Sequence, residues 1–406
     1  MDVINPESKK FDAIVCLSAI DWDFLWQRTQ EIMSQFANMG YPVLFVENTG
    51  ARRPGLRDAP RVWNRLKKGL SPTNNIEQIE KSSNIEIFSP MALPFPYMSM
   101  AIKFNTNLVI ERVLEFGKKH DIPLNRILLW SYLTTPLAVE LAQDLPWAAV
   151  VIDLVSDPCK VQGDKKFAVS HQRMLKLADV VLCASVPMKN TAKQQISGDS
   201  DKLLLFEDGF STGLIDTVQY GLGEPSLLDQ MEDTTMVAYI GGVNNKIWWD
   251  AVSVMVSEFP EINFVFAGPK DYNELPCHKA SDNIYWIPSF KQYNELGNFL
   301  SKCKAGLIPY FPSPYVAEMR PAKINEYLVM GLPIVATKLP EIERFARENG
   351  SGIIYLAETV EGFAEALRQA LDDDSKEYRE KRQQIAKRRS WGYICKELDF
   401  TLHGLI

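Results

Sequence analysis

The feature that most constrains the fold of this chain is a strand, a helix and a second strand that follow one another near its start. The apolar run Phe11–Ser18 precedes a helical pattern that stops at Gly40, and Tyr41–Glu47 is a second apolar run. Strands joined through a helix pair in parallel, because the helix has to cross the sheet before the next strand begins. The sequence therefore predicts a parallel sheet covered by helices.

The same alternation of strands and helices recurs along the chain, which at 406 residues is long enough for two domains. Further strand-like runs are Asn84–Ser89, Arg126–Tyr132, Ala148–Val155, Leu203–Gly209, Met236–Gly242, Ile262–Gly268, Ile284–Pro288 and Ala305–Tyr310. Tyr220–Thr235 interrupts them with glycine, proline and several acids, as a domain boundary does. We predict an α/β fold with domains over residues 1–220 and 221–385, and a terminal helix over 386–406.

Composition argues against several classes of protein. The net charge of −7 disfavours general affinity for nucleic acid. No apolar run approaches the roughly 18 residues that cross a bilayer, and the first ten residues lack the apolar stretch of a secretory signal. The six cysteines and four histidines are scattered and form no zinc-binding pattern. We expect a protein of the reducing cytosol without a structural zinc.

Two carboxylates flank a predicted helix start in the second half of the chain. Pro321 suits the first position of a helix, Gly331 ends that helix, and Glu318 and Glu326 stand on either side of its start. A helix amino terminus favours an anion, and carboxylates accept hydrogen bonds from hydroxyls. This combination suits a ligand that carries both phosphate and sugar. The alternative is that Glu318 caps the helix and Glu326 is a solvated surface residue.

A second candidate phosphate site follows the predicted strand that ends in Gly241 and Gly242. Glycines let a ligand approach the backbone, and Lys246, at the start of the predicted next helix, can reach a phosphate. A tight turn between strand and helix explains the glycine pair equally well. No G-x-G-x-x-G pattern follows the first strand, which disfavours a dehydrogenase that binds a dinucleotide.

The loop after the first strand carries several large and charged side chains. Asp21, Trp22 and Arg28 lie there, and ligands bind where loops follow the strands of a parallel sheet. Asp153 ends a later strand, and it could either orient an acceptor hydroxyl or cap the next helix. The alternative for the tryptophans of the loop is that they pack the edge of the domain.

Residues 51–70 form a basic segment within an acidic protein. Seven arginines and lysines stand there against one acid, and apolar residues including Trp63 recur at helical spacing. Such a segment suits an anionic membrane surface. The alternative is a solvated basic helix that docks on its own domain.

Pro321–Thr337 resembles the P-x-K-x-x-E-Y-L-x-x-G-x-P-[IV]-V-A-T segment of retaining GT-B glycosyltransferases with a Glu-x7-Glu motif (family 4-like, group 1). The string D-W-D-F-L-W-Q-R, which ends at Arg28, is similar to the first loop of the same family. The resemblance implies two Rossmann-like domains that face a central cleft, with a terminal helix that crosses back to the first domain. It also assigns the sugar of the donor to Glu318 and the ribose to Glu326.

Two departures from the family pattern concern the phosphate site. Met319–Pro321 replaces a glycine-rich turn, and Gly242 stands where the family commonly has arginine. Pro321 offers no N–H to a phosphate. We therefore expect Lys246, Lys323 and Arg320 to supply the positive charge.

The resemblance implies a glycosyltransferase of the hexosyltransferase class. Its donor would be a nucleotide-diphospho-sugar, bound with Gly241, Gly242, Lys246, Arg320, Pro321, Lys323, Glu318 and Glu326, and Glu318 and Lys246 would be catalytic. Its acceptor would be a glycan or a lipid-linked molecule, bound with Asp21, Trp22, Arg28 and Asp153. No metal or other cofactor is expected, and the setting would be cell-surface polysaccharide synthesis in the cytoplasm or on the inner face of the membrane. The alternatives are a nucleotide-sugar 2-epimerase and a relative that binds sugar nucleotides without catalysis.

Overall fold

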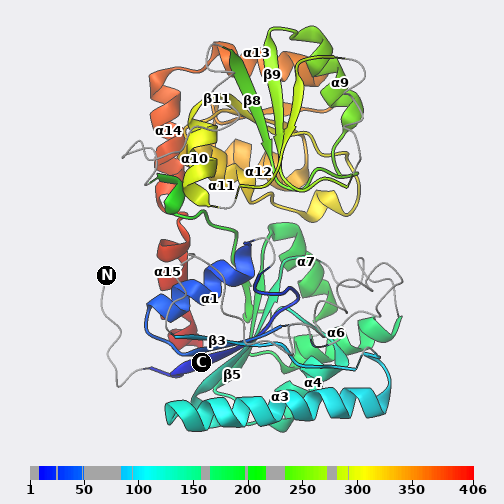
Figure 1. Ribbon diagram of the computed structural model, residues 1–406, viewed down its shortest axis with the longest axis vertical. Helices are drawn as coiled ribbons and strands as arrows, with labels where there is room; N and C mark the ends of the chain where they lie inside the picture. Colours follow the sequence, from blue (N-terminus) through cyan, green and yellow to red (C-terminus); the bar gives the residue numbers. More distant parts are fainter. Residues whose placement is uncertain are drawn as a thin grey trace. The chain divides into compact units, whose positions relative to one another are not determined.

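The computed structural model describes residues 9–23, 26–47, 49, 84–93, 95–156, 165–196, 200–215, 234–271, 281–290 and 292–406. Contacts within the chain define two compact units. The first contains Met1–Ala184, Met188–Phe206 and Cys395–Ile406, and the second contains Ser185–Pro187 and Glu207–Ile394. Each unit is an α/β structure built on one parallel sheet (Figure 1). The basic segment 51–70 lies outside the described residues.

The first unit contains a seven-stranded sheet in the order β3-β2-β1-β4-β5-β6-β7, and all of its pairs are parallel. Its strands are β1 (Ala13–Leu17), β2 (Val43–Val46), β3 (Ile85–Phe88), β4 (Ile127–Ser131), β5 (Ala149–Leu154), β6 (Val180–Cys183) and β7 (Leu203–Leu205). Every residue of β1, β2, β4, β5 and β6 is buried, because helices cover both faces of the sheet. This burial explains why these strands appear in the sequence as continuous apolar runs, and it confirms the predicted parallel sheet.

The helices of the first unit are α1 (Arg28–Asn38), α3 (Ser99–His120), α4 (Pro136–Asp144), α6 (Lys165–Leu177) and α7 (Val186–Gln195). One apolar cluster joins α3, α4, α6 and α7 to the side chains of Ala13, Val15 and Leu17 on one face of β1. On the opposite face, the ring of Phe36 on α1 packs against the ring of Trp130, with 5.6 Å between the ring centres. Figure 1 shows α3 and α4 on one side of the strands and α1 on the other.

The second unit contains a six-stranded parallel sheet in the order β10-β9-β8-β11-β12-β13. Its strands are β8 (Thr235–Ile240), β9 (Ile262–Ala267), β10 (Ile284–Ile287), β11 (Cys303–Ile308), β12 (Ile334–Thr337) and β13 (Ile354–Ala357). Its helices are α9 (Trp249–Glu258), α10 (Tyr293–Ser301), α11 (Lys323–Val329), α12 (Pro340–Asn349), α13 (Gly362–Asp372) and α14 (Lys376–Lys387), with a 3-10 turn, η5, over Val316–Glu318. No helix among the described residues of either unit is both long and apolar enough to span a bilayer.

The last helix, α15 (Trp391–Leu405), ends in the first unit. The Tyr41 hydroxyl donates to Asp399 at 3.0 Å and lies 2.9 Å from His403 Nε2, and the Phe11 ring stacks on His403. The terminal helix thus returns to the first domain, as the resemblance implied.

The contacts divide the chain earlier than the sequence analysis did. Residues from Glu207 to Ile394 belong to the second unit, whereas the sequence predicts the boundary at residue 220. The reason is that Phe210 forms a parallel bridge with Ser390, which belongs to the second unit. The residues that follow Glu207 therefore pack with the second unit. Most of the expected boundary segment Tyr220–Thr235 lies outside the described residues, which resume at residue 234.

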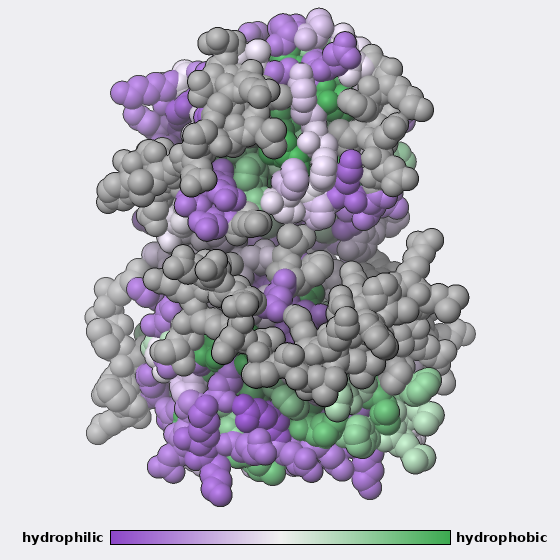
Figure 2. Space-filling view, viewed as in Figure 1, coloured by the Kyte–Doolittle hydropathy of each residue, from purple (hydrophilic) through white to green (hydrophobic). Residues whose placement is uncertain are grey.

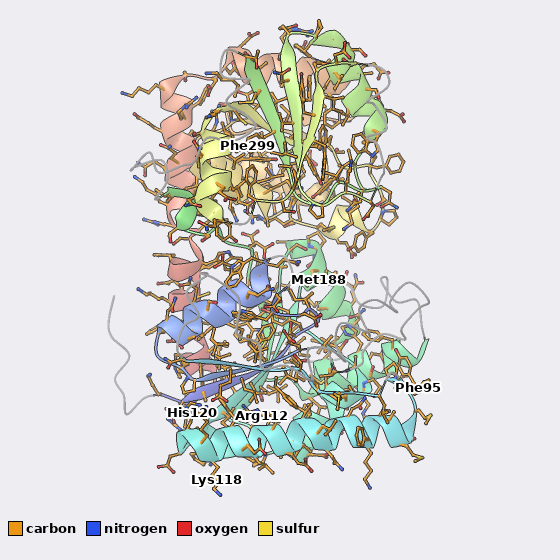
Figure 3. All side chains as sticks on the ribbon, in the orientation of Figure 1. Phe95, Arg112, Lys118, His120, Met188 and Phe299 are labelled. Carbon is orange, nitrogen blue, oxygen red and sulfur yellow. The ribbon has the colours of Figure 1, made fainter. Side chains whose placement is uncertain are left out.

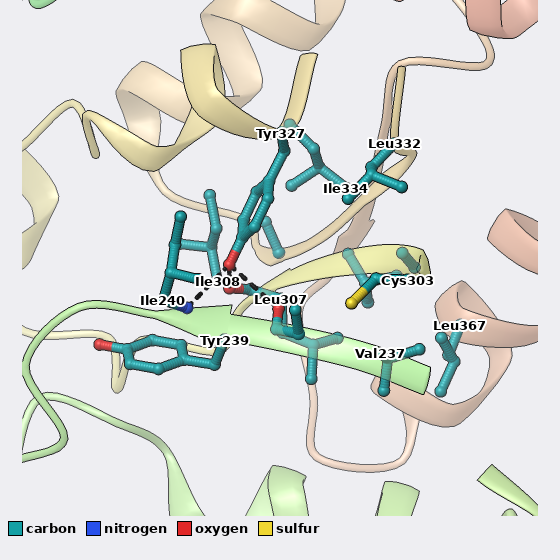
Figure 4. Close-up of a cluster of buried hydrophobic side chains, with 14 of the residues drawn as sticks. Val237, Tyr239, Ile240, Cys303, Leu307, Ile308, Tyr327, Leu332, Ile334 and Leu367 are labelled. Atoms are coloured by element: carbon teal, nitrogen blue, oxygen red, sulfur yellow. Dashed lines mark hydrogen bonds between the residues drawn. The ribbon is translucent and has the colours of Figure 1, made fainter. Parts of the chain in front are cut away.

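Tyr327 lies between the two central strands of the second sheet, where their pairing ends. The parallel pairing of β8 with β11 ends at Ala238 and Gly306, and the Tyr327 hydroxyl lies beyond this point, between the two strands (Figure 4). It accepts the Ile240 N–H at 3.1 Å and lies 3.0 Å from the Ala238 carbonyl oxygen, to which it donates. A Cβ on Gly306 would overlap the tyrosine ring. The strands can therefore separate here without leaving buried polar groups unpaired.

Replacing Tyr327 with phenylalanine should lower the free energy of unfolding by about 1–3 kcal/mol, because buried backbone groups would lose their partner. Urea unfolding followed by circular dichroism measures the change. The control is Tyr355→Phe, whose hydroxyl bonds Asp373 at the surface, and we expect it to cost less than about 1 kcal/mol. Equal losses in the two variants would contradict the structural role of Tyr327.

Candidate functional site

The predicted donor residues follow two strands at which the order of the second sheet reverses. From β8 the chain proceeds to β9 and β10 on one side, and from β11 it proceeds to β12 and β13 on the other. In open parallel sheets ligands bind outside the carboxyl ends of the strands at such a reversal. Gly241–Lys246 follows β8, and the segment that leads to Glu318 follows β11.

Glycines fix the backbone of the loop after β8. Gly241 has a φ of 112°, in the left-handed region that disfavours side chains, and its N–H donates to the Ala267 carbonyl at 2.8 Å. Gly268, at the end of β9, lies so close that a Cβ there would overlap the Gly241 carbonyl. These two glycines bring the main chains of neighbouring loops together at the carboxyl edge of the sheet.

The helix after this loop begins later than predicted. We expected it near Lys246, but α9 begins at Trp249. The Asn244 side chain accepts the Lys246 N–H at 3.0 Å, and Ile247 then bridges to Tyr310. These contacts keep the chain in a turn for a few more residues.

Lys246 lies between the loops that follow β8 and β11. Its carbonyl accepts the N–H of Phe311 at 2.7 Å, and its Nζ lies 5.1 Å from the centre of the Tyr315 ring. The side chain is half-buried. The positively charged side chain of Lys246 therefore lies against the segment that ends at Glu318.

Lys323 is a buried cation next to the glycine loop. Its Nζ donates to the Tyr310 hydroxyl at 2.7 Å and lies 4.1 Å from the centre of the Tyr239 ring. The Tyr239 hydroxyl in turn donates to the Gly242 carbonyl at 2.9 Å. A Cβ on Gly241 would lie 3.5 Å from Lys323 Nζ. The lysine and the two tyrosines thus support the loop from the side of the sheet.

Glu318 and Glu326 occupy the two elements that the sequence indicated. Glu318 ends the turn η5, and its carbonyl accepts the Ser185 hydroxyl at 2.6 Å; Glu326 lies on α11. Both side chains are half-buried. The helix start differs from our expectation, because α11 begins at Lys323 and Pro321 precedes it, with the Pro321 carbonyl accepting the Ile324 N–H.

Arg320 is paired inside the unit, although we expected it to offer its charge to a phosphate. It is 5% exposed, its Nε lies 3.4 Å from a carboxylate oxygen of Glu207, and its NH2 group donates to Asn325 at 3.0 Å. Its guanidinium also lies over the ring of Phe345. Burial lowers the pKa of Arg320 to about 10, which leaves it charged near neutral pH.

Glu207 joins three arginines. Besides Arg320, it accepts from Arg344 at 2.5 Å and from Arg389 at 2.7 Å. Burial alone would raise the pKa of Glu207, but the charges of Arg320 and Arg389 and the hydrogen bonds from Arg389 and Arg344 outweigh it and lower the pKa from 4.5 to about 2. Glu207 begins the longer stretch of the second unit. Its ion pair with Arg320 joins this stretch to the segment that carries Glu318.

In the first unit, the loop after β1 packs against the sheet. Trp22 is 7% exposed, and its ring meets the Phe45 ring edge-on with 4.9 Å between the ring centres. The main-chain N–H of Trp22 donates to a carboxylate oxygen of Glu47 at 2.6 Å. Asp21 precedes it, and the Asp21 carbonyl is 3.5 Å from the side-chain amide of Gln30. The packing alternative thus describes the surroundings of Trp22, and the acceptor role of Asp21 and Trp22 stays a prediction.

Arg28 and Asp153 form a buried ion pair. The two side chains are 7% and 0% exposed, with 2.9 Å between an Arg28 NH2 nitrogen and an Asp153 oxygen. Arg28 also donates to the Phe206 carbonyl at 2.8 Å and lies over the Phe206 ring. The pair thus joins the start of α1 to β5 and to the end of β7. This internal role was not foreseen, and the contact of Arg28 and Asp153 with an acceptor stays a prediction.

Several residues of this arrangement were missed in the sequence. Tyr239 and Tyr310 were noted only as strand residues, and Glu207 was noted only as part of a strand and turn. The position of the tyrosines at strand ends was the available signal. Glu207 gave none, because Arg344 and Arg389 lie 137 and 182 residues away in the chain.

Replacing Glu207 with glutamine should lower the free energy of unfolding at pH 7 by about 3–5 kcal/mol, because three arginines would lose their shared carboxylate in a buried site. The matched control is Glu365→Gln, which removes an exposed arginine partner and should cost less than about 1 kcal/mol. Urea unfolding measures both.

The pH dependence follows from the lowered pKa of Glu207. Its stabilisation is complete above about 4.5 and is lost as the pH falls toward about 2. The difference between wild type and Glu207→Gln should therefore shrink over this range. A difference that stays constant with pH, or that is already absent at pH 7, would contradict the role given to the carboxylate.

Comparison with protein families gives a match within the second unit. Residues 234–373 match the family model described as Glycosyl transferases group 1. This range begins next to β8 and ends after α13, so it includes every predicted donor residue from Gly241 to Glu326.

A curated relative supports the same assignment. TuaH of Bacillus subtilis (strain 168), which is named as a teichuronic acid biosynthesis glycosyltransferase, is 24% identical over 235 residues. The match covers 56% of this chain and 57% of TuaH, so it spans little more than half of the relative.

Solved structures are similar over nearly the whole chain. Sucrose-phosphate synthase from Thermosynechococcus elongatus has a TM-score of 0.66 at 14% identity, and HepE of Anabaena in complex with UDP and glucose has 0.62 at 13%. WaaG, a glycosyltransferase involved in lipopolysaccharide biosynthesis, has 0.59 at 11%. Each match covers 97% of this chain and at least 99% of the other. The fold is therefore GT-B, with two Rossmann-like domains, and residues 234–373 match the glycosyl transferases group 1 family.

Proposed function

We propose that this protein is a retaining glycosyltransferase that moves a sugar from a nucleotide-diphospho-sugar to a glycan or a lipid-linked acceptor. One observation carries the proposal: the group 1 match includes both loops at the reversal between β8 and β11, where Gly241, Lys246 and Glu318 lie. The activity of the whole protein is inferred from this domain and from the GT-B fold.

The proposed chemistry is stabilisation of a departing diphosphate. Main-chain groups near Gly241 and Gly242 can approach the phosphates closely, and Lys246 can donate to the oxygens on which negative charge develops. Lys323 keeps the loop in place through Tyr239 and Tyr310, and its own buried charge adds to the positive potential. Arg320 is assigned to Glu207 and not to the donor.

Glu318 and Glu326 complete the proposed donor site. Carboxylates accept hydrogen bonds from hydroxyls, so we assign Glu318 to the sugar and Glu326 to the ribose. No covalent nucleophile is proposed. The acceptor hydroxyl would attack on the face from which the diphosphate leaves and would give its proton to a departing phosphate oxygen. The new bond to the sugar carbon then replaces the broken one with the same configuration. We propose that this proceeds without a metal.

The structural relatives favour uridine diphosphate as the first donor nucleotide to examine, because HepE was solved with UDP and glucose. TuaH, by its name, favours an acceptor that belongs to a cell-surface polysaccharide. We assign the acceptor to the first unit, beside the loop that contains Asp21 and Trp22. The setting that fits these assignments is the cytoplasm or the inner surface of the membrane.

Two other functions lead to different products. A nucleotide-sugar 2-epimerase would release free nucleotide without an acceptor. A non-catalytic relative would bind nucleotide without turnover, and Gly242, in place of the arginine that the family commonly has, is the observation that favours it.

The nucleotide is tested by thermal unfolding of the protein with UDP, GDP, dTDP, CDP or ADP. A ligand at about a hundred times its dissociation constant stabilises the native state by about 2.7 kcal/mol, which should raise the midpoint by several degrees. We expect UDP to give the largest shift. If none of the five shifts the midpoint, the loops after β8 and β11 do not form a nucleotide site.

Replacing Lys246 with alanine should lower the rate of transfer at least about tenfold, or about 1.4 kcal/mol, because the leaving diphosphate loses a cation. Glu326→Gln should mainly weaken donor binding. The matched control is Lys304→Ala, since Lys304 is exposed near the amino-terminal end of β11, away from the carboxyl edge of the sheet. Transfer rates, measured with a donor that carries the nucleotide identified by thermal unfolding, distinguish the two site variants from the control. Wild-type activity in both site variants would refute the assignment.

A further inference from the structure

Phe311 is an exposed aromatic ring in the loop that follows β11. Thirteen large apolar side chains among the described residues are exposed, and Phe311, at 51%, is the one that belongs to the second unit. The others belong to the first unit, where Figure 3 shows Phe95 at the end of α3 and Figure 2 shows hydrophobic residues gathered at that end. A single exposed apolar side chain can be incidental, so the surroundings of Phe311 decide what its ring can do.

The main chain of Phe311 pairs with the loop that follows β8. Ile247 forms an antiparallel bridge with Tyr310. The Phe311 N–H donates to the Lys246 carbonyl at 2.7 Å, so Phe311 lies directly opposite Lys246 in this short pairing. Side chains that are directly opposite each other in antiparallel strands lie on the same face. The pairing therefore places the ring of Phe311 beside the side chain of Lys246.

One face of this pairing is buried and the other is open to solvent. Ile247 and Tyr310 are 3% and 7% exposed, and the Tyr310 hydroxyl accepts a hydrogen bond from Lys323. Lys246 and Phe311 occupy the opposite face, where Lys246 is half-buried and Phe311 is exposed. The exposed ring is thus on the same side as the lysine that we assign to the diphosphate.

The ring of Phe311 is supported from the protein side. The Trp248 N–H donates to the Pro309 carbonyl at 2.7 Å, which continues the same pairing. The Trp248 ring meets the Phe311 ring edge-on with 5.9 Å between their centres, and it also packs against the buried ring of Phe363 on α13. These contacts fix the position of the exposed ring relative to the sheet.

The position of Phe311 corresponds to the sugar side of the donor. In a nucleotide-diphospho-sugar, the diphosphate is bonded to the sugar at one end and to the ribose at the other. Glu318, which we assign to the sugar, lies seven residues after Phe311 in the same loop. Glu326, which we assign to the ribose, lies on α11 with Lys323, on the side that the buried face of the pairing contacts. A ring beside Lys246 and on the open face therefore meets the sugar.

We propose that Phe311 packs against the apolar face of the transferred sugar, a role that rests on the proposed glycosyltransferase function. A face of a pyranose ring carries C–H groups, and the negative face of an aromatic ring attracts their partial positive charge. Burial of the phenyl ring against the sugar adds a hydrophobic contribution. Glu318 would accept hydrogen bonds from hydroxyls at the edge of the sugar while Phe311 contacts its face. The two residues would then select for a sugar on the diphosphate.

Calorimetric binding without an acceptor tests the proposal with the full-length protein. The probes are the nucleoside diphosphate that gives the largest shift in the thermal unfolding test and the glucose conjugate of the same nucleotide. Phe311→Ala should raise the dissociation constant of the glucose conjugate about tenfold, because the sugar loses its apolar contact. The dissociation constant of the nucleotide alone should change less than about twofold, since Lys246 and the glycine loop are intact.

Two further variants serve as controls. Phe311→Tyr keeps the aromatic ring at an exposed position and should bind both probes like wild type. Phe400→Ala removes a phenylalanine of α15 that is 65% exposed in the first unit, and it should also bind both probes like wild type. Thermal unfolding without ligand checks that each variant is folded.

The outcomes distinguish this proposal from the proposed function. If Phe311→Ala binds the glucose conjugate as tightly as wild type, the ring does not contact the sugar and the proposal is overturned, while the transferase function stands. If the variant loses the nucleotide and its conjugate equally, the ring serves the nucleotide or the loop, which also overturns the proposal. If wild type binds none of the five nucleotides, the proposed function itself fails, and the role of Phe311 fails with it.

Discussion

The organisation of the second unit depends on one hydroxyl group. Where β8 and β11 separate, their backbone groups would be buried without partners, and Tyr327 supplies a donor and an acceptor at that point. Beyond the separation the loops after the two strands meet again, because Ile247 bridges to Tyr310 and the Lys246 carbonyl accepts the Phe311 N–H. Gly306 completes the arrangement, because only a residue without a side chain leaves room for the ring. The candidate donor site thus lies next to the point where Tyr327 takes over from the pairing of β8 with β11.

The sequence predicted the fold better than the boundaries of its elements. Strands buried on both faces are continuous apolar runs, so both parallel sheets could be found. Helix starts were misplaced at Lys246 and Pro321. At Lys246 the reason is that its N–H donates to Asn244 and that Ile247 bridges to Tyr310, which is distant in the sequence and leaves no local pattern. The family resemblance supplied the candidate donor residues, whose roles stay predictions.

Charged residues illustrate where sequence reasoning ends. Arg28, Arg320 and Asp153 lie in or near loops and were assigned to ligands, yet each is almost completely buried with an opposite charge. The sequence does not indicate whether a charged side chain in a loop faces a ligand or an oppositely charged partner inside the protein. The partner of Arg320 lies on a different segment, and only the folded chain brings the two together. Lys246 is half-buried, and Lys323 makes its hydrogen bond with a tyrosine hydroxyl, so these lysines differ from the arginines.

The return of the chain to its first unit makes the second unit an insertion. Cys395–Ile406 supplies His403 and Asp399 to Phe11 and Tyr41, which lie far away in the sequence. During translation the first unit therefore lacks part of its core until residues 395–406 have been made. The inserted unit contains all of its own strands by then and can fold sooner. The first unit is thus completed after the second, although most of its residues precede the second unit in the sequence.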